Sequence, residues 1–276
     1  MTVQKKRIKE SLEYILARKP FKEKTDLALV TYLNPSFLKL FKIYERIGYE
    51  FIPPQFESEG GSDEGELIFA SDKITKRKLI ILNGRFHFYN GYTMRETAHY
   101  IYILKALGVK TVLLVGDVGH LNPRFKTGGA AFIYDHINLM GDNPLIGEND
   151  DSLGPRFPDM SNAYDGKLYS KIEQLLIDSK FRFYPSVYLG IPGPETETEA
   201  ECRFYREIGA DVLGYSLVPE NIAAIHAGLK VIAFGMIARE LVADRLQEIS
   251  EDQKAKNKLK AENAFGKILP LIIGIL

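Results

Sequence analysis

The 276-residue sequence has one cysteine, no tryptophan and no excess of charge of either sign. The single cysteine, Cys202, excludes an internal disulfide framework and argues against a cysteine-based metal site. Lysine and arginine together number 36, as do aspartate and glutamate, so the formal net charge is zero. A neutral chain lacks the broad basic surface that nucleic acids and acidic membranes bind, so we expect neither as a partner. A local basic pocket is compatible with this balance.

Long apolar runs are also missing. The most apolar stretch, ILPLIIGIL at residues 268–276, is shorter than the roughly 20 residues that span a bilayer. Residues 1–19 are charged and have the spacing of an amphipathic helix, with one apolar face made by Ile8, Leu12, Ile15 and Leu16. They lack a signal peptide's continuous apolar core. We therefore expect a cytoplasmic protein whose C-terminal helix packs on the body of the fold or on a neighbouring subunit.

Several motifs of enzyme chemistry are absent as well. The chain contains no GxxxxGKS or GxGxxG phosphate loop, no GxSxG nucleophile turn and no spacing typical of a metal site. We expect neither a metal ion nor a cofactor. His99, His136 and His226 fall in predicted helices or strands, where a histidine satisfied by hydrogen bonds is the more common case. These patterns reach no further than a phosphate- or sugar-handling enzyme that uses no metal.

Short β-branched runs alternate with helical stretches, which is typical of an α/β domain with a mainly parallel sheet. The predicted strands are residues 27–32, 65–70, 78–83, 111–115, 131–136, 186–190 and 231–235. The predicted helices are residues 93–107, 161–179, 197–209, 219–228 and a tail at 251–276, whose Gly266 and Pro270 put its continuity in question. Residues 138–160 form a long irregular loop, of the kind that is functional or disordered. No linker is evident, so we predict one domain over residues 1–276.

The stretch GRFHFYNGY at residues 84–92 follows a predicted strand and gathers polar side chains. In an extended segment Arg85, His87 and Tyr89 share a face, and a guanidinium beside an imidazole can donate hydrogen bonds to an anion. A surface turn with a solvated arginine explains the stretch equally well. Ligands of open α/β sheets bind beyond the carboxyl ends of strands, where Glu197 and Ser216 also fall. Each has a plainer role, at a helix start or as a helix cap.

Five stretches together resemble the trimeric purine nucleoside phosphorylases, the family that includes methylthioadenosine phosphorylase. They are GRFHFYNGY from residue 84, LGVKTVLLVGDVGHLNPRFKTGG from 107, DHINLMGDNPLIGENDD from 135, PRFPDMSNAYD from 155 and GPETETEAECRFYREIGADVLGYSLVPENIAAIHAGLKV from 193. They follow the family's order and spacing, and the resemblance covers most of the chain from about residue 27 onward.

The resemblance implies a three-layer α/β/α fold with a mainly parallel mixed sheet, in a homotrimer whose active sites lie near subunit interfaces. It implies that phosphate, as co-substrate, attacks the anomeric carbon of a purine nucleoside. The products would be the free base and a sugar 1-phosphate. Positive charge gathers on the ribose in the transition state while the purine leaves with negative charge, so the site must hold phosphate and donate hydrogen bonds to the base.

The resemblance also assigns roles on the phosphate and sugar sides. Arg85, His87 and Ser216 match the residues that bind phosphate. Tyr89 matches a tyrosine that contacts the sugar, and Tyr215 stands where a methionine normally packs on the ribose. By this resemblance His87 is also one of three catalytic residues.

On the base side, Glu197 matches the glutamate that holds the purine, and Thr196 replaces an aromatic residue that stacks on it. Arg239 replaces the asparagine that donates to the leaving base; it can donate instead, or form a salt bridge with Asp117 or Glu197. Glu197 and Arg239 are the other two catalytic residues that the resemblance implies. Phe157 matches an aromatic residue lent to the neighbouring subunit's sugar pocket.

Other positions depart from the family's pattern. A glycine-rich GSGLG loop that grips phosphate corresponds to VTYLNP at residues 30–35, so Tyr32 replaces a serine and the flexible glycines are gone. Asp117, in GDVGHLN, places a carboxylate near the anion, where like charges repel. Gln253 stands near the position of a histidine that contacts the sugar's 5′-hydroxyl.

Each such loss costs about one to a few kcal/mol, and about 1.4 kcal/mol is a tenfold change in rate. Three interpretations follow. The chain is a divergent purine nucleoside phosphorylase, a relative that binds purines or nucleosides without turnover, or a nucleosidase in which water replaces phosphate as acceptor.

Overall fold

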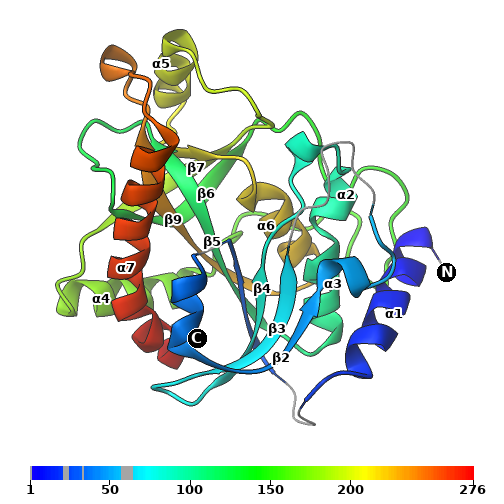
Figure 1. Ribbon diagram of the computed structural model, residues 1–276. Helices are drawn as coiled ribbons and strands as arrows, with labels where there is room; N and C mark the ends of the chain where they lie inside the picture. The colour runs from blue at the N-terminus through cyan, green and yellow to red at the C-terminus, as the bar shows by residue number, and fades with distance from the viewer. Residues whose placement is uncertain (1, 21–24, 33, 57–64) are drawn as a thin grey trace.

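A nine-stranded mixed sheet forms the centre of the protein (Figure 1). The structure is a computed structural model that describes residues 2–20, 25–32, 34–56 and 65–276. The strand order is β2-β3-β4-β1-β5-β8-β7-β6-β9, and β5 also pairs with β9. The strands are β1 (Leu27–Thr31), β2 (Phe41–Gly48), β3 (Glu66–Asp72), β4 (Lys78–Asn83), β5 (Thr111–His120), β6 (Ala130–Asn138), β7 (Phe183–Gly190), β8 (Val212–Gly214) and β9 (Lys230–Glu240).

The extra pairing closes β5, β8, β7, β6 and β9 into a ring, because each of these strands pairs with two others of the set. β1 and β4 extend the sheet from β5 in parallel, and β3 and β2 add antiparallel strands at the far edge. The carboxyl ends of β1, β4, β5 and β9 therefore lie at the same edge, because these four strands run parallel to one another.

Helices cover both faces of the sheet and give the three-layer arrangement that the sequence predicts. They are α1 (Val3–Leu16), α2 (Met94–Thr97), α3 (His99–Ala106), α4 (Gly166–Asp178), α5 (Glu199–Glu207), α6 (Leu217–His226) and α7 (Glu251–Ile275). α1 contacts α3, and α3 and α2 contact α6, whereas α4 contacts α7, which packs against β9. Figure 1 shows α1, α2 and α3 on one side and α4 and α7 on the other.

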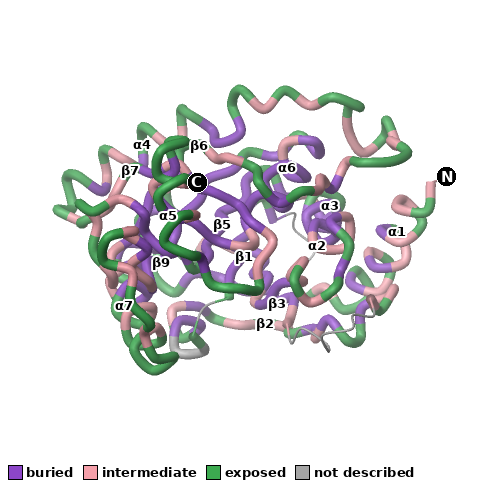
Figure 2. The backbone as a smooth tube through the Cα atoms, turned by 90° about the horizontal axis from the view of Figure 1, so that it is seen from above, coloured by how far each residue is buried: buried purple, intermediate pink, exposed green. Residues whose placement is uncertain are grey.

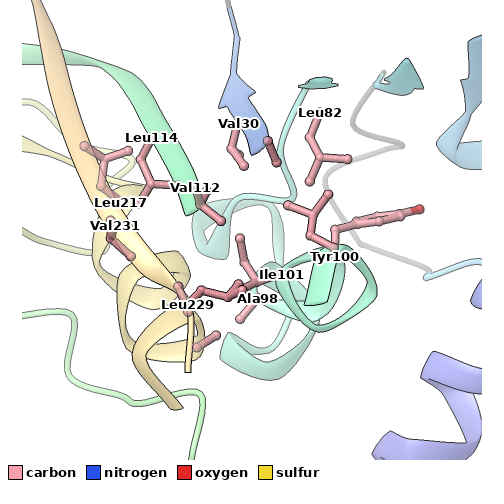
Figure 3. Close-up of a cluster of buried hydrophobic side chains, with 14 of the residues drawn as sticks. Val30, Leu82, Ala98, Tyr100, Ile101, Val112, Leu114, Leu217, Leu229 and Val231 are labelled. Carbon is pink, nitrogen blue, oxygen red and sulfur yellow. The ribbon is translucent and has the colours of Figure 1, made fainter. Parts of the chain in front are cut away.

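The two apolar layers follow from the alternation of side chains along the central strands. On β5, Val112 and Leu114 join the cluster that packs on α3 and α6, whereas Leu113 and Val115 join the cluster that packs on α4 and α7. Figure 3 shows Val112 and Leu114 close to Leu217 of α6 and Val231 of β9. Residues 112–115 of β5 are a continuous apolar run, as expected of a strand segment buried on both faces. In Figure 2 the buried central strands are enclosed by exposed loops and helix faces.

The predicted elements are present, with differences at their ends. β5 and β9 run on to His120 and Glu240, beyond the predicted residues 115 and 235. The predicted helix over residues 93–107 is interrupted at Ala98 and forms α2 and α3. The helix predicted from residue 161 begins at Gly166, because the Asp165 side chain accepts the Leu168 N–H and caps it.

Two helix expectations and one strand need correction. α7 is continuous through Gly266 and Pro270, where the sequence put its continuity in question. Its apolar face, including Phe265, is buried in the cluster that also contains Leu113 and Val115 of β5. On α1 the buried residues are Ile8, Ser11 and Ile15, whereas Leu16 is half exposed. β2 was not predicted, because this edge strand alternates buried and exposed residues and carries charged side chains.

The three histidines expected to be structural are hydrogen bonded. His99 Nε2 lies 3.0 Å from Ser11 Oγ and joins α1 to α3, and burial lowers the pKa of His99 to about 3. His226 Nδ1 lies 3.0 Å from Tyr102 Oη. His136 Nδ1 lies 3.1 Å from Tyr164 Oη, although His136 is half-buried and not a core residue.

Cys202 is buried and unpaired. Among the described helices, none combines the length and the apolar character that a bilayer requires. The assignment of residues 1–276 to one domain stays a prediction.

Candidate active site

A cavity of about 460 Å³ lies at the carboxyl-end edge of the sheet. Its walls come from the segments that follow β1, β4 and β8, from the last residues of β5 and β9, and from the first turns of α7. The lining residues are Tyr32, Arg85, His87, Tyr89, Asp117, Val118, Gly214, Tyr215, Ser216, Ala238, Arg239, Glu251, Lys254, Ala255 and Lys258. Six residues that the sequence assigns to the site therefore meet in one cavity.

The remaining predicted residues have other positions. Glu197 is buried and contacts two lining side chains, those of Tyr215 and Arg239. Thr196 is exposed and does not line the cavity. Phe157, in the long loop between β6 and α4, is 86% exposed and also lies outside the cavity lining.

Arg85 is buried in an ion pair with Glu220 of α6. Its Nε donates to Glu220 Oε1 at 2.7 Å, and its Nη2 donates to Oε2 at 3.3 Å and to the Val30 carbonyl at 3.0 Å. The surface-turn alternative, with a solvated arginine, is therefore wrong. Nη1 makes no hydrogen bond within the described part of the chain, so this nitrogen can still donate to a ligand. Glu220 neutralises much of the guanidinium charge and fixes its orientation.

His87 and Tyr89 form an aromatic wall of the cavity with Tyr215. The rings of His87 and Tyr89 stack at 4.7 Å between centroids, and Tyr89 meets Tyr215 edge to face at 6.0 Å. The chain is extended at His87, as expected, but Phe88–Asn90 then forms a 3₁₀ turn that ends at Gly91 with φ of 93°. Stacked rings beside polar groups make a surface suited to a sugar or a base.

Ser216 precedes α6, but its side chain does not cap the helix. The buried Tyr188 hydroxyl accepts hydrogen bonds from the backbone N–H groups of Ser216 at 3.3 Å and Leu217 at 3.5 Å. The helix-cap alternative for Ser216 is therefore wrong. Its hydroxyl has no hydrogen bond to a described residue and is available to a ligand in the cavity.

Glu197, Arg239 and Tyr215 form a hydrogen-bonded triad. Arg239 Nη1 donates to Glu197 Oε2 at 3.1 Å, and Nη2 donates to Oε1 at 3.3 Å and to Tyr215 Oη at 2.9 Å. Tyr215 in turn donates to Glu197 Oε1 at 2.7 Å. Burial raises the pKa of the Tyr215 phenol, so it remains a donor at neutral pH. Of the partners considered for Arg239, the structure shows Glu197. Glu197 also lies outside α5, whose cap is Thr198.

A second charge cluster joins α7 to β5 and to the segment after β1. Lys258 Nζ lies 2.7 Å from Asp117 Oδ2 and donates to the Tyr32 carbonyl at 2.9 Å. Glu262 Oε1 lies 3.8 Å from the same ammonium and accepts the Asn34 N–H at 3.3 Å. The Asp117 carboxylate is thus paired with Lys258, a partner that the sequence analysis did not consider.

The sequence analysis missed Lys258, Glu262 and Glu220. All three lie on helices far along the chain from the residues they contact. Lys254, Lys258 and Glu262 are four residues apart and share one helix face, which was the available signal. In the described ranges there is no group of three or more His, Cys, Asp or Glu side chains that could hold a metal ion.

The Arg85–Glu220 pair is expected to behave as a coupled unit in unfolding. Glu220→Gln leaves a buried guanidinium without its charge partner, so the free energy of unfolding should fall by about 3–5 kcal/mol. The double variant Arg85→Met/Glu220→Leu should recover most of that loss. Urea denaturation checks both, with the exposed Glu199→Gln as control, expected within about 0.5 kcal/mol of the unchanged protein. If Arg85→Met and Glu220→Leu, measured singly, add up to the double variant, the two side chains are uncoupled.

Glu262 should make stability fall as pH rises from about 4.5 to about 7. Burial, assisted by Asp117 and opposed by Lys258, raises the pKa of Glu262 from 4.5 to about 7. Between these two values the folded state binds more protons than the unfolded state, so the free energy of unfolding decreases with rising pH. Glu262→Gln removes this dependence. Its stability relative to the unchanged protein should therefore be higher at pH 8 than at pH 5, as measured by thermal unfolding at both values. An equal difference at the two pH values contradicts the assignment.

Comparison with known proteins identifies the family of the chain. The sequence profile of the phosphorylase superfamily matches residues 51–273. The chain is 37% identical over 228 residues to purine nucleoside phosphorylase 1 of Bacillus subtilis, which covers 83% of each chain. It is 36% identical over 235 residues to the Mus musculus purine nucleoside phosphorylase, covering 83% of this chain and 79% of that one.

Solved structures agree with these relatives. Isoform 2 of the Schistosoma mansoni purine nucleoside phosphorylase, in complex with cytosine and ribose-1-phosphate, has a TM-score of 0.87 at 29% identity, covering 97% of this chain and 95% of that one. A Schistosoma purine nucleoside phosphorylase in complex with hypoxanthine has a TM-score of 0.83 at 30% identity, covering 96% of each. The chain therefore belongs to the phosphorylase superfamily, in the family of the purine nucleoside phosphorylases.

Proposed function

We propose that this protein is an active purine nucleoside phosphorylase, which splits a purine nucleoside with phosphate into the free base and a sugar 1-phosphate. The observation that carries the proposal is that two sets of groups meet at one cavity. Arg85, His87 and Ser216 line it and offer donors for an anion. Tyr215 and Arg239 also line it and, with the Glu197 carboxylate that they contact, offer charged hydrogen-bonding groups for a base.

The roles follow from this geometry. Phosphate binds at Arg85 Nη1, His87 and the free hydroxyl of Ser216, and the ribose lies against Tyr89 and Tyr215. A phosphate oxygen attacks the anomeric carbon as the bond from that carbon to the base nitrogen breaks. The base takes the bonding electron pair and is then protonated. Stabilising the charge that the base acquires is the main demand on the protein.

Arg239 and Glu197 act on the base. Glu197 accepts a hydrogen bond from a ring N–H of the purine, and Arg239 donates to an acceptor on the leaving base. Burial by itself lowers the pKa of Arg239, but the charge of Glu197 and the contact with Tyr215 raise it above its usual value. The guanidinium therefore stays charged and serves as an electrostatic stabiliser, not as a proton donor. Thr196, which is exposed, supplies no stacking surface.

The proposal includes phosphate as co-substrate with no cofactor or metal, a cytoplasmic location and a role in purine salvage. The names of the relatives support the reaction. Two alternative functions, binding without turnover and hydrolysis, are separated from phosphorolysis by the assay below. Binding without turnover has specific support in the closed Glu197–Arg239 pair, which a base must share.

Phosphate-dependent cleavage of inosine tests the proposal. Purified protein should release hypoxanthine with phosphate present, form ribose 1-phosphate, and release little base without phosphate. Glu197→Gln should lower kcat/KM by about 10²-fold or more, since a charged acceptor on the base is lost. The exposed Glu199→Gln is the matched control and should leave kcat/KM unchanged.

The alternatives give different results in the same assay. Base release that does not depend on phosphate identifies a nucleosidase. Binding of inosine with no release, beside an active relative under identical conditions, identifies a protein that has lost turnover. Either result rejects phosphorolysis.

We also propose a homotrimer in which Phe157 enters the sugar pocket of a neighbouring subunit. Phe157 is 86% exposed in a long loop, so the described residues of one chain cover little of its ring. Phe157→Ala should raise KM for the nucleoside several-fold, while Phe204→Ala, at another exposed phenylalanine, should not. Sedimentation velocity should give the mass of three chains. A monomer, or equal KM values in both variants, contradicts this arrangement.

A further inference from the structure

Both arginines of the cavity lining are paired with carboxylates. The guanidinium of Arg85 is neutralised by Glu220, and that of Arg239 is neutralised by Glu197. A phosphate dianion that binds there meets donors whose charge is already matched. Each further charged N–H donor that reaches such an anion strengthens its binding.

Lys258 can supply such a donor, although Asp117 also matches its charge. Its side chain is 20% exposed and lines the same cavity as His87 and Ser216. Its ammonium has three N–H donors, of which the Asp117 carboxylate takes one at 2.7 Å and the Tyr32 carbonyl takes another at 2.9 Å. Glu262 Oε1, at 3.8 Å, is beyond hydrogen-bond distance. One donor is therefore left for a ligand.

The surroundings hold Lys258 in place. The side chain extends from α7 across the end of β1 to the end of β5, so it bridges three elements that form the cavity wall. Its ammonium also lies 5.1 Å from the centre of the Tyr32 ring, a distance at which a cation is attracted to an aromatic face. A lysine with two fixed contacts loses less freedom when an anion arrives than a lysine in solvent does.

In the segment after β1, the backbone N–H of Asn34 already donates to the Glu262 carboxylate. This amide is therefore not available to a ligand. Lys254, the other lysine of the cavity lining, lies 2.5 Å from Glu251 and belongs to a separate pair. Unlike Lys254, Lys258 is held by contacts to Tyr32, which follows β1, and to Asp117 of β5.

We propose that Lys258 is a phosphate-binding residue, whose ammonium group, positioned by Asp117 and the Tyr32 carbonyl, binds the phosphate co-substrate. The inference rests on the proposed function for the identity of the anion. It also gives Asp117 a role, because this carboxylate orients the lysine that binds phosphate.

Titration with inorganic phosphate by isothermal calorimetry tests the proposal without turnover. Lys258→Gln should raise the Kd for phosphate about tenfold or more, as expected when one charge-assisted hydrogen bond is lost. Lys258→Arg keeps the charge and should hold the Kd within about threefold of the unchanged protein. Lys256→Gln is the matched control, because this exposed lysine lies on the same helix outside the cavity lining. Its Kd should not change.

A second titration, with hypoxanthine, separates phosphate binding from general damage to the site. Lys258→Gln should leave the Kd for the base unchanged, and its circular dichroism should match that of the unchanged protein. If Lys258→Gln fails to fold, Lys258→Met, which keeps the packing of the stem, replaces it in both titrations.

The outcomes are distinct. A Kd for phosphate that is equal in Lys258→Gln and the unchanged protein overturns the proposal, as does an unchanged protein that binds no phosphate. Phosphate binding that depends on Lys258, with no cleavage of inosine, supports the assignment of Lys258 and rejects the proposed function instead.

Discussion

The buried ion pair of Arg85 and Glu220 holds together the elements from which the cavity is built. Arg85 follows β4, Glu220 lies on α6, and the same guanidinium also donates to the carbonyl of Val30 on β1. An unpaired charge at either position would cost several kcal/mol, so the three elements are held in a fixed relation. The hydroxyl of Ser216, at the start of α6, and the ring of His87, two residues beyond Arg85, take their places from this pair.

The other charges of the site follow the same rule of internal compensation. Glu197 is matched by Arg239 on the base side, and Asp117 is matched by Lys258 on the anion side. A site of this kind is preorganised, because its charged side chains hold their positions before a ligand arrives. It also requires each ligand to share groups that already have partners. Affinity therefore depends on the difference between two sets of hydrogen bonds and not on the number formed with the ligand.

Much of the fold could be predicted, because the buried strands have apolar runs that stand out in the sequence. The continuous run of β5 is one example, whereas β2 escaped prediction because Lys42 and Arg46 alternate with its apolar residues. Arg85, His87 and Ser216 could be found because each follows a stretch predicted to end at the ligand-binding edge, whereas Arg239, which lies within β9, was indicated only by the resemblance to the family. Glu220 and Lys258 could not be found, since no local pattern tells which distant strand end a helical side chain will reach. For the same reason the burial of Arg85 could not be predicted, because it depends on the ion pair with Glu220.

The Tyr188 hydroxyl, which accepts the first two amides of α6, has a thermodynamic consequence. Backbone N–H groups at the start of a helix commonly form a rigid binding site for an anion. With them engaged inside the protein, an anion near Ser216 would meet the rotatable hydroxyl of that residue and side chains already held by partners. Ordering a side chain costs about 0.5–1.5 kcal/mol of conformational entropy. Most of that cost is met when the chain folds, so binding would order little besides the Ser216 hydroxyl.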